Sequence, residues 1–250
     1  MLSIIIPTLN EEKYLPLLIK LIKSQTYKDY EIIVADGGSK DKTIKIAKAY
    51  GCKIAAGGSA AKGRNEGVKA AKGEIFLFLD ADIVNLAPQF LEKLLEGFEK
   101  RNLDVASFSI YPQGNKFDKL AYGLYNFWVK LSQNFLPHAT EAVLIRKEIH
   151  QKIGGFDEEI KIGEDHDYAR RGAKFGKFGF LEIPPVLSSS RRFDRDGRLK
   201  TYLKFLGAGA YMLFFGPVKL NIFKYRFDHY LPPVFPHKNV RGLKNKKKEL

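Results

Sequence analysis

The hydrophobic residues in the first hundred positions alternate between two spacings. Short apolar runs rich in β-branched residues predict strands over 2–6, 31–35, 53–56, 74–79 and 105–110. Between them, apolar residues recur at helical spacing. They predict a helix capped by Asn10, helices over 41–50 and about 60–71, and one opened by Pro88. Strands that alternate with helices of this length predict a parallel sheet covered by helices on both faces.

Polar residues gather where the predicted strands end. Pro7-Thr8 follows the first strand, Asp36-Gly37 follows the second, and Asp80-Ala81-Asp82 follows the strand over 74–79. Open α/β sheets bind ligands beyond the carboxyl ends of their strands. We therefore expect a ligand site at this edge of the sheet.

The pattern loosens after Tyr111. Residues 120–136 are rich in aromatic side chains, a strand is predicted over 141–145, and a helix over 164–174. Residues 205–218 are apolar and uncharged, but they are fewer than the about 20 that a membrane-spanning helix needs. This stretch suits an interfacial helix, a hairpin dipping into a membrane, or a buried helix.

Charge divides the chain unevenly. The 250 residues carry 42 Lys+Arg and 28 Asp+Glu, a net charge of +14. Residues 191–250 hold 15 of these cations and 4 of the acids, a net +11, which leaves +3 for residues 1–190. A basic C-terminal part suits nucleic acid, an anionic membrane surface, or no partner beyond solvent.

Composition bears on the size of the core and on the cellular compartment. The hydrophobic share of 45% is enough for a sizeable core, and the single Cys52 excludes an intramolecular disulfide. No basic segment precedes the first apolar run, as it would in a secretory signal, so we expect a reduced, cytoplasmic setting.

Carboxylates and arginines are the candidate chemical groups. Asp80 and Asp82 suit a hard divalent cation that also holds a diphosphate, although Asp is also common in capping turns. The Asp36 turn has glycines that allow close backbone approach, and its carboxylate can accept a hydrogen bond from a base or ribose. Taken alone, the turn is more typical of an ordinary strand-to-helix turn with Ser39 or Asp41 as N-cap.

Two later motifs add chemistry. The run 163–167 places three carboxylates and His166 at a predicted helix start, where an acid is stabilised by the helix dipole or acts as a general base. His166 is also a conceivable metal ligand. Arg191 and Arg192 suit a phosphate, or a solvated charge run.

The order of these motifs resembles the family 2 glycosyltransferases of the GT-A fold, over about residues 1–195. The segments that carry the resemblance are Pro7-Thr8-Leu9-Asn10-Glu11, Val34-Ala35-Asp36-Gly37-Gly38-Ser39-Lys40-Asp41, Gly63-Arg64-Asn65, Phe78-Leu79-Asp80-Ala81-Asp82, Gly154-Gly155-Phe156-Asp157-Glu158, Glu164-Asp165 and Arg191-Arg192. The resemblance implies a Rossmann-like, mostly parallel α/β sheet flanked by helices. It also implies an inverting transfer of a sugar from a nucleotide diphosphate sugar.

The resemblance also implies residue roles. Asp165 matches the catalytic base, and Asp80 and Asp82 match the residues that hold Mg²⁺ or Mn²⁺. Arg191 and Arg192 match a basic motif that contacts the diphosphate. The residues implied to bind the nucleotide are Pro7, Thr8, Glu11, Asp36, Arg64, Asp80 and Ala81.

One position departs from the family pattern. Many members carry Asp-Asp-Gly-Ser where this chain has Asp36-Gly37-Gly38-Ser39. The second Asp can pair with a uracil, and Gly37 stands in its place. UDP and GDP therefore both remain candidate donor nucleotides.

The acceptor is expected at a membrane. We expect a GT-A domain over 1–195, an apolar helical extension over 196–236 that suits membrane association, and a basic tail over 237–250 that includes Lys244 and 246–248. A polyprenyl phosphate or lipid-linked glycan at the inner face of the cell membrane would then accept the sugar.

Three other hypotheses about the function stay open. In the first, 205–218 packs on the sheet and a soluble transferase uses a non-lipid acceptor. A nucleotidyltransferase is the second, although Leu9-Asn10-Glu11-Glu12 lacks the Gly-rich basic signature of that class. The third is a nucleic-acid-binding module. It explains the basic tail but not the carboxylates at strand ends, which would repel phosphates, so we expect no nucleic-acid partner.

Overall fold

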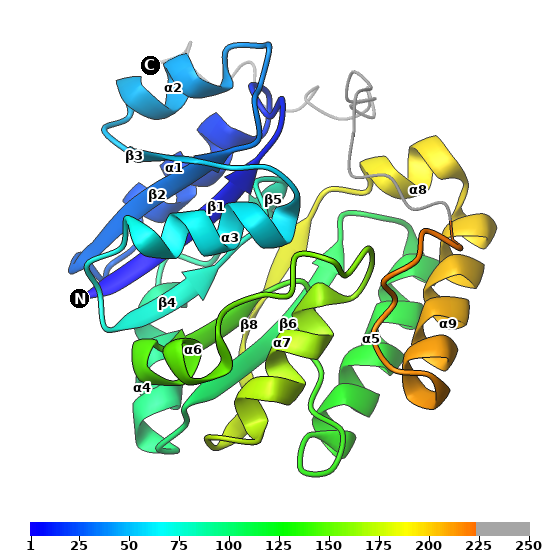
Figure 1. Ribbon diagram of the computed structural model, residues 1–250. Coiled ribbons are helices and arrows are strands. Elements are labelled where there is room, and N and C mark those ends of the chain that lie inside the picture. Colours follow the sequence, from blue (N-terminus) through cyan, green and yellow to red (C-terminus); the bar gives the residue numbers. More distant parts are fainter. Residues whose placement is uncertain (224–250) are drawn as a thin grey trace, which may run out of the picture.

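One eight-stranded sheet forms the centre of the protein (Figure 1). The computed structural model describes residues 1–223, and the strands follow the order β3-β2-β1-β4-β7-β6-β8-β5. The strands are β1 (Leu2–Thr8), β2 (Tyr30–Asp36), β3 (Lys53–Ala56), β4 (Ile75–Phe78), β5 (Ile83–Asn85), β6 (Val105–Pro112), β7 (Val143–Arg146) and β8 (Phe178–Ser188).

The sheet is mixed, and most of its strands run in one direction. The pairs β1–β2, β2–β3, β1–β4 and β6–β8 are parallel, whereas β7 is antiparallel to both of its neighbours and β5 is antiparallel to β8. The carboxyl ends of β1, β2, β4, β6 and β8 therefore meet at one edge. The expected mostly parallel α/β sheet flanked by helices is confirmed.

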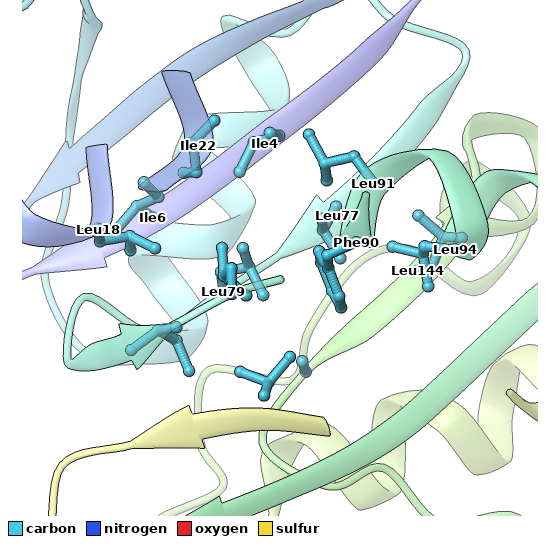
Figure 2. Close-up of a cluster of buried hydrophobic side chains, with 14 of the residues drawn as sticks. Ile4, Ile6, Leu18, Ile22, Leu77, Leu79, Phe90, Leu91, Leu94 and Leu144 are labelled. Carbon is cyan, nitrogen blue, oxygen red and sulfur yellow. The ribbon is translucent and has the colours of Figure 1, made fainter. Parts of the chain in front are cut away.

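Helices cover both faces of the sheet. They are α1 (Leu15–Lys23), α2 (Thr43–Ala49), α3 (Ala60–Lys69), α4 (Phe90–Lys100), α5 (Lys116–Ser132), α6 (Lys147–Ile153), α7 (Glu164–Ala173), α8 (Arg191–Asp196) and α9 (Arg198–Phe214). Side chains alternate along a strand, so Ile4 and Ile6 pack with α1 and α4 on one face (Figure 2). Ile5 packs on the other face in a cluster that includes residues of α3, α6 and α7.

Helices α5, α8 and α9 extend the molecule beyond α7 (Figure 1). Asp118 of α5 ties that helix to α9, since its fully buried carboxylate accepts hydrogen bonds from Arg198 (3.0 Å) and Tyr202 (2.9 Å). The Phe193 ring of α8 packs against Tyr122 of α5 and Tyr202 of α9. These contacts hold the three helices together.

The sequence pattern predicted most of the strands and helices as far as β6. It predicted β1 to β4, β6, α2, α3 and α4 within a few residues. It gave no sign of β5, α6 or α8, which are short elements. Residues 120–136 were noted for aromatic content alone and belong mostly to helix α5. The apolar stretch 205–218 overlaps helix α9, which starts earlier and ends at Phe214.

Asn10 is not a helix cap, which corrects one prediction. Its backbone is left-handed, with φ of 58°, and its side-chain carbonyl accepts a hydrogen bond from the Lys40 N–H at 2.7 Å. Helix α1 instead begins at Leu15, with Pro16 in its first turn. Asn10 joins two loops rather than starting a helix.

The segment boundaries predicted at 195/196 and 236/237 stay predictions. Residues 224–236 and the basic tail 237–250 lie outside the described residues.

Candidate functional site

Arg64 connects two loops at the carboxyl edge of the sheet. It lies on α3, whose backbone runs so close to β1 that a Cβ on Gly67 would approach Ile5 Cγ2 to 2.4 Å. The buried guanidinium donates to Asp80 Oδ1 at 2.8 Å and to Glu164 Oε1 at 2.7 Å. Burial alone would lower the pKa of Arg64, but the neighbouring carboxylates outweigh it and raise the pKa. Arg64 is therefore a fixed positive charge between the two loops.

The Asp36 carboxylate is used within its own turn. It accepts hydrogen bonds from the Gly38 N–H (2.9 Å), the Ser39 N–H (2.8 Å) and the Ser39 hydroxyl (2.5 Å). The Thr8 hydroxyl donates to the same carboxylate at 3.2 Å. A ligand at this turn would meet a carboxylate whose orientation is already set.

The loops after β1 and β2 are bonded to each other. The Asn10 N–H donates to Ser39 Oγ at 2.7 Å, and the Glu11 N–H donates to Thr43 Oγ1 at 2.8 Å. Such cross-loop bonds hold the segment from Pro7 to Glu11 in one arrangement before any ligand arrives.

The space around Gly37 leaves no room for a side chain. A Cβ there would lie 2.8 Å from the carbonyl oxygen of Gly58, in the loop between β3 and α3. A side chain at this position therefore requires backbone movement. The glycine that departs from the family motif matches the close approach of a neighbouring loop.

Arg191 lies between two acids from different loops. Its guanidinium forms a bidentate ion pair with Glu11, at 2.6 and 2.8 Å, and its Nε lies 3.3 Å from Asp82 Oδ2. It also packs over the Tyr14 ring, 4.8 Å from the centroid. Burial raises the pKa of Glu11 to about 7, although the bond to Arg191 opposes that rise.

A cleft lined by both acidic and basic side chains lies beside this ion pair. Its volume is about 380 Å³ including the open mouth. The lining residues are Asp80, Asp82, Tyr122, Glu141, Ser188, Ser189, Arg191, Arg192, Phe193 and Phe205. The loop after β4, helix α5, the loop before β7, the end of β8 and helices α8 and α9 thus contribute to one polar site, and its three carboxylates face two arginines.

Asp80 and Asp82 fit the part of a metal site that a protein supplies. Burial raises the pKa of Asp80, and the nearby Asp82 adds to that rise against the effect of Arg64. Such crowded carboxylates favour a divalent cation. Among residues 1–223 no three His, Cys, Asp or Glu side chains are grouped to hold a metal. Two carboxylates supplemented by substrate phosphates are a usual Mg²⁺ arrangement.

Asp165 lies at the start of α7, next to the Glu164 that binds Arg64. Its carboxylate accepts hydrogen bonds from the His166 N–H at 2.9 Å and from the Glu141 N–H at 3.2 Å. Burial opposes ionisation, but the His166 imidazole, the Arg64 guanidinium and these two donors hold the pKa of Asp165 below its ordinary value. The group is therefore ionised near neutral pH.

Glu141 is a site residue that the sequence did not indicate. Its backbone is left-handed, with φ of 69°, which is uncommon for a residue with a side chain. Burial raises its pKa to about 8, opposed by Arg192 and reinforced by Asp82 and Asp80. The only signal in the sequence is an acid at the first position of the strand predicted over 141–145. Strained residues of this kind often mark functional sites.

The structure therefore brings most of the expected site residues together. Glu11, Asp82 and Arg191 form one linked group, and Arg64 joins Asp80 to the loop of Asp165. Ala81 stands between Asp80 and Asp82 in the chain, and its side chain is buried. Arg192 lines the same cleft, with its guanidinium 5.8 Å from the centroid of the Phe205 ring.

Comparisons with known proteins agree on the architecture. A family model described as "Glycosyl transferase family 2" matches residues 3–156. An uncharacterized glycosyltransferase of Rickettsia typhi is 33% identical over 219 residues, which are 80% of this chain and 63% of that protein. The chain spans about three-fifths of the length of the curated relatives it matches.

Two solved structures share the fold. S. aureus TarS 1–349 with UDP-GlcNAc superposes with a TM-score of 0.63 at 20% identity, covering 76% of this chain and 58% of that one. The mannosyltransferase PcManGT of Pyrobaculum calidifontis, with GDP-Man and Mn²⁺, gives 0.61 at 18% identity, covering 75% and 56%.

Proposed function

Because this chain belongs to glycosyl transferase family 2, we propose that it transfers a sugar from a nucleoside diphosphate sugar to an acceptor, with inversion at the anomeric carbon. One observation carries the proposal. Arg64 binds both Asp80, beside the cleft, and Glu164, the neighbour of Asp165. A carboxylate pair suited to a diphosphate-bound cation is thereby held next to a carboxylate suited to accept a proton.

The donor nucleotide would lie across the loops after β1 and β2. Pro7, Thr8, Glu11 and the Asp36 turn would hold the base and ribose, and Asp80 with Ala81 would lie against the ribose. The cross-loop hydrogen bonds support this, since they fix the shape of the segment. Both UDP and GDP stay candidates: TarS was solved with UDP-GlcNAc and PcManGT with GDP-Man.

Asp80 and Asp82 would hold Mg²⁺ or Mn²⁺ together with the diphosphate. When bound, the cation supplies positive charge that stabilises the leaving diphosphate. The two carboxylates fit this role because each is crowded by other acids of the cleft, and PcManGT was solved with Mn²⁺.

The transfer itself would depend on Asp165 and two arginines. A carboxylate oxygen of Asp165 takes the proton from the acceptor hydroxyl. At the same time, the oxygen of that hydroxyl forms a bond to the anomeric carbon of the sugar. The bond from that carbon to the diphosphate oxygen breaks, and its electron pair stays on the nucleoside diphosphate. Arg191 and Arg192 stabilise this charge, as oriented donors do in other active sites. Where the acceptor is a phosphate that is already ionised, Asp165 only orients it.

Arg191 has to change partners to do this. In the free protein its guanidinium is engaged by Glu11 through two hydrogen bonds. A diphosphate competes with the Glu11 carboxylate for the same donors, and Glu11 accommodates the loss readily because burial already favours its protonated form.

The acceptor is proposed to be a lipid phosphate or lipid-linked glycan at the inner face of the cell membrane. Large apolar side chains on α5 and α9 are between 43% and 76% exposed, and we call them the α5–α9 face. They are Phe117, Leu120, Leu124, Phe127, Trp128, Leu131, Leu199, Leu203, Leu206, Leu213 and Phe214. Exposed apolar surface of this extent marks an interaction site.

Charge favours an anionic membrane as the partner of that face. The two helices carry six Lys and Arg, and their single acid, Asp118, is fully buried against Arg198. Tyr122 and Phe205, from the same helices, line the cleft. An acceptor held in the membrane could thus reach the cleft along the face. Within residues 1–223, no helix has the length and apolar content needed to cross a bilayer.

A donor panel tests the transfer. Thermal stability is measured with UDP-, GDP- and dTDP-sugars, each with and without Mn²⁺, and nucleoside diphosphate release is measured after adding polyprenyl phosphate. We expect one nucleotide to stabilise the protein in a metal-dependent way. Correctly folded protein that responds to no donor would refute the transferase proposal. Release with a soluble acceptor but not with the lipid would refute only the lipid acceptor.

Vesicle flotation tests the membrane part separately. We expect wild-type protein to float with anionic vesicles at low salt. The Leu124→Gln/Leu206→Gln variant should bind at least about tenfold more weakly, because a buried leucine contributes about 1.5–3 kcal/mol. The matched control is Leu17→Gln, which changes a leucine of α1 that is 40% exposed. Wild-type protein that stays with the soluble fraction would remove the membrane from the proposal and leave the donor site untouched.

A further inference from the structure

A second, basic cavity lies between α7 and the end of α9. Its volume is about 480 Å³ including the open mouth, and the space open to water-sized molecules is about 180 Å³. It shares no lining residue with the cleft that holds Asp80 and Asp82. The lining residues are Asp167, Arg170, Arg171, Lys174, Met212 and Pro217. Three cations and one carboxylate thus face one small space.

The arginines of this cavity are held in place by the protein. Arg171 donates to Asp167 Oδ2 at 2.7 Å and to the Ile153 carbonyl at 2.8 Å. Arg170 lies 3.1 Å from His138 Nε2. These contacts fix both guanidinium groups, and Asp167 neutralises only one of the three positive charges.

Two donors of these guanidinium groups have no protein acceptor. Nε of Arg170 and Nη2 of Arg171 are buried and make no hydrogen bond within the described chain. A buried donor without a partner is costly, so such groups are normally satisfied by an ion or by water. Cations near a helix C-terminus are favoured by the helix dipole, which accounts for the charges but not for the unsatisfied donors.

The size and the surroundings of the cavity suit an oxyanion. Its volume is several times the about 30 Å³ of one water molecule. Exposed apolar side chains follow two lining residues along the chain, Phe175 after Lys174 and Leu213 after Met212. A phosphate with an attached hydrocarbon would therefore find apolar contacts beside the cationic site.

We propose that Arg170, Arg171 and Lys174 bind a phosphate group, supplied as free phosphate or as the headgroup of an anionic phospholipid. Guanidinium groups bind phosphate oxygens through strong, charge-assisted hydrogen bonds. The site is independent of glycosyl transfer, since none of these residues lines the cleft.

Calorimetric titration with inorganic phosphate, at ionic strength held constant with chloride, tests the site in the 250-residue chain. We expect saturable binding to wild-type protein, weakened about tenfold, or about 1.4 kcal/mol, in Lys174→Gln and in Arg170→Gln. Lys174 is exposed, so its replacement does not threaten folding. The matched control is Lys93→Gln, an exposed lysine of α4, and it should bind phosphate like the wild type.

The cleft arginines provide the decisive comparison. Phosphate binding that is lost in Arg192→Gln but kept in Lys174→Gln would place the anion in the cleft and overturn the proposal. Absence of saturable binding to the wild type would overturn it as well.

Vesicles then identify the source of the phosphate. Phosphatidylcholine vesicles with and without phosphatidylglycerol are compared for wild type, Lys174→Gln and Lys93→Gln. A loss of phosphatidylglycerol-dependent binding in Lys174→Gln alone assigns the site to a lipid headgroup. Equal vesicle binding by all three, with weakened phosphate titration in Lys174→Gln, assigns it to free phosphate.

Discussion

Replacing Arg64 by methionine should destabilise the protein far more than replacing a surface arginine. The substitution keeps an unbranched apolar stem but leaves Asp80 and Glu164 without their shared cation. The side chain of Glu164 is only 9% exposed, so its unpaired charge is expected to cost about 3–5 kcal/mol. Asp80 is 35% exposed and solvent screens it, so its share is about 0–1 kcal/mol.

Arg146→Met is the matched control. Arg146 also pairs with two acids, Glu99 and Asp104, and its guanidinium lies 5.0 Å from the centroid of the Phe98 ring. Arg64 has the same arrangement, 5.2 Å from the Phe156 ring. Neither acid of Arg146 is as buried as Glu164, however, since they are 54% and 28% exposed against 9% for Glu164. We therefore expect this variant to lose about 1 kcal/mol or less.

Urea unfolding, followed by circular dichroism and by fluorescence of the single tryptophan, Trp128, measures both variants. For a chain of this size, the combined loss of about 3–6 kcal/mol in Arg64→Met corresponds to a Tm lower by roughly 6–24 °C. Adding Glu164→Gln to Arg64→Met should restore part of the stability, because it removes the unpaired charge. Equal losses in Arg64→Met and Arg146→Met, or no restoration by Glu164→Gln, would refute the reasoning.

Three further predictions address the site. Asp165→Asn should lower turnover by about a hundredfold or more while calorimetry finds nucleotide binding unchanged, since it removes a proton acceptor and keeps the shape; unchanged turnover would remove Asp165 from the mechanism. Gly37→Asp should destabilise the fold by about 1–3 kcal/mol in urea, because its Cβ would meet the Gly58 carbonyl oxygen at 2.8 Å; a neutral effect would show that the loops part easily. Glu141 has a folded pKa of about 8 against an ordinary 4.5, so its stabilising contribution is complete below pH 4.5 and is lost as the pH rises to about 8. Glu141→Gln does not titrate, and its stability relative to wild type should rise across that window by up to about 1.4 kcal/mol per pH unit in urea unfolding; a pH-independent difference would contradict the burial of this carboxyl.

Local pattern and residue chemistry were enough to predict the frame of the fold. Apolar runs such as 2–6 can be buried on both faces only within a sheet covered by helices, so periodicity alone predicts β1, β2 and β4. The strand ends then place Asp36, Asp80 and Asp82 at one edge, because parallel strands share their direction. Helix α5 was missed because its burial pattern is unusual: its large apolar residues are mostly exposed, and the residues it buries are polar apart from Val129.

Site chemistry was only partly predictable. The motif order indicated Asp165 and Arg191 through resemblance, and it named the family that the comparisons confirmed. Their individual roles stay predictions that the experiments above address. Glu141 gave almost no signal, because its importance lies in a left-handed backbone and in burial among other acids.

Neighbours along the chain are therefore enough to predict most strands and helices of the first hundred residues, the acidic strand ends and the unequal distribution of charge. Which charges meet depends instead on the packed molecule. Arg64 and Glu164 are 100 positions apart, and Glu11 and Arg191 are 180 apart, yet each pair is within hydrogen-bond distance. Pairing over such separations depends on how the sheet orders its strands, with β7 placed between β4 and β6. The energy of each pair depends on its burial, and burial is a property of the packed molecule that no local pattern contains.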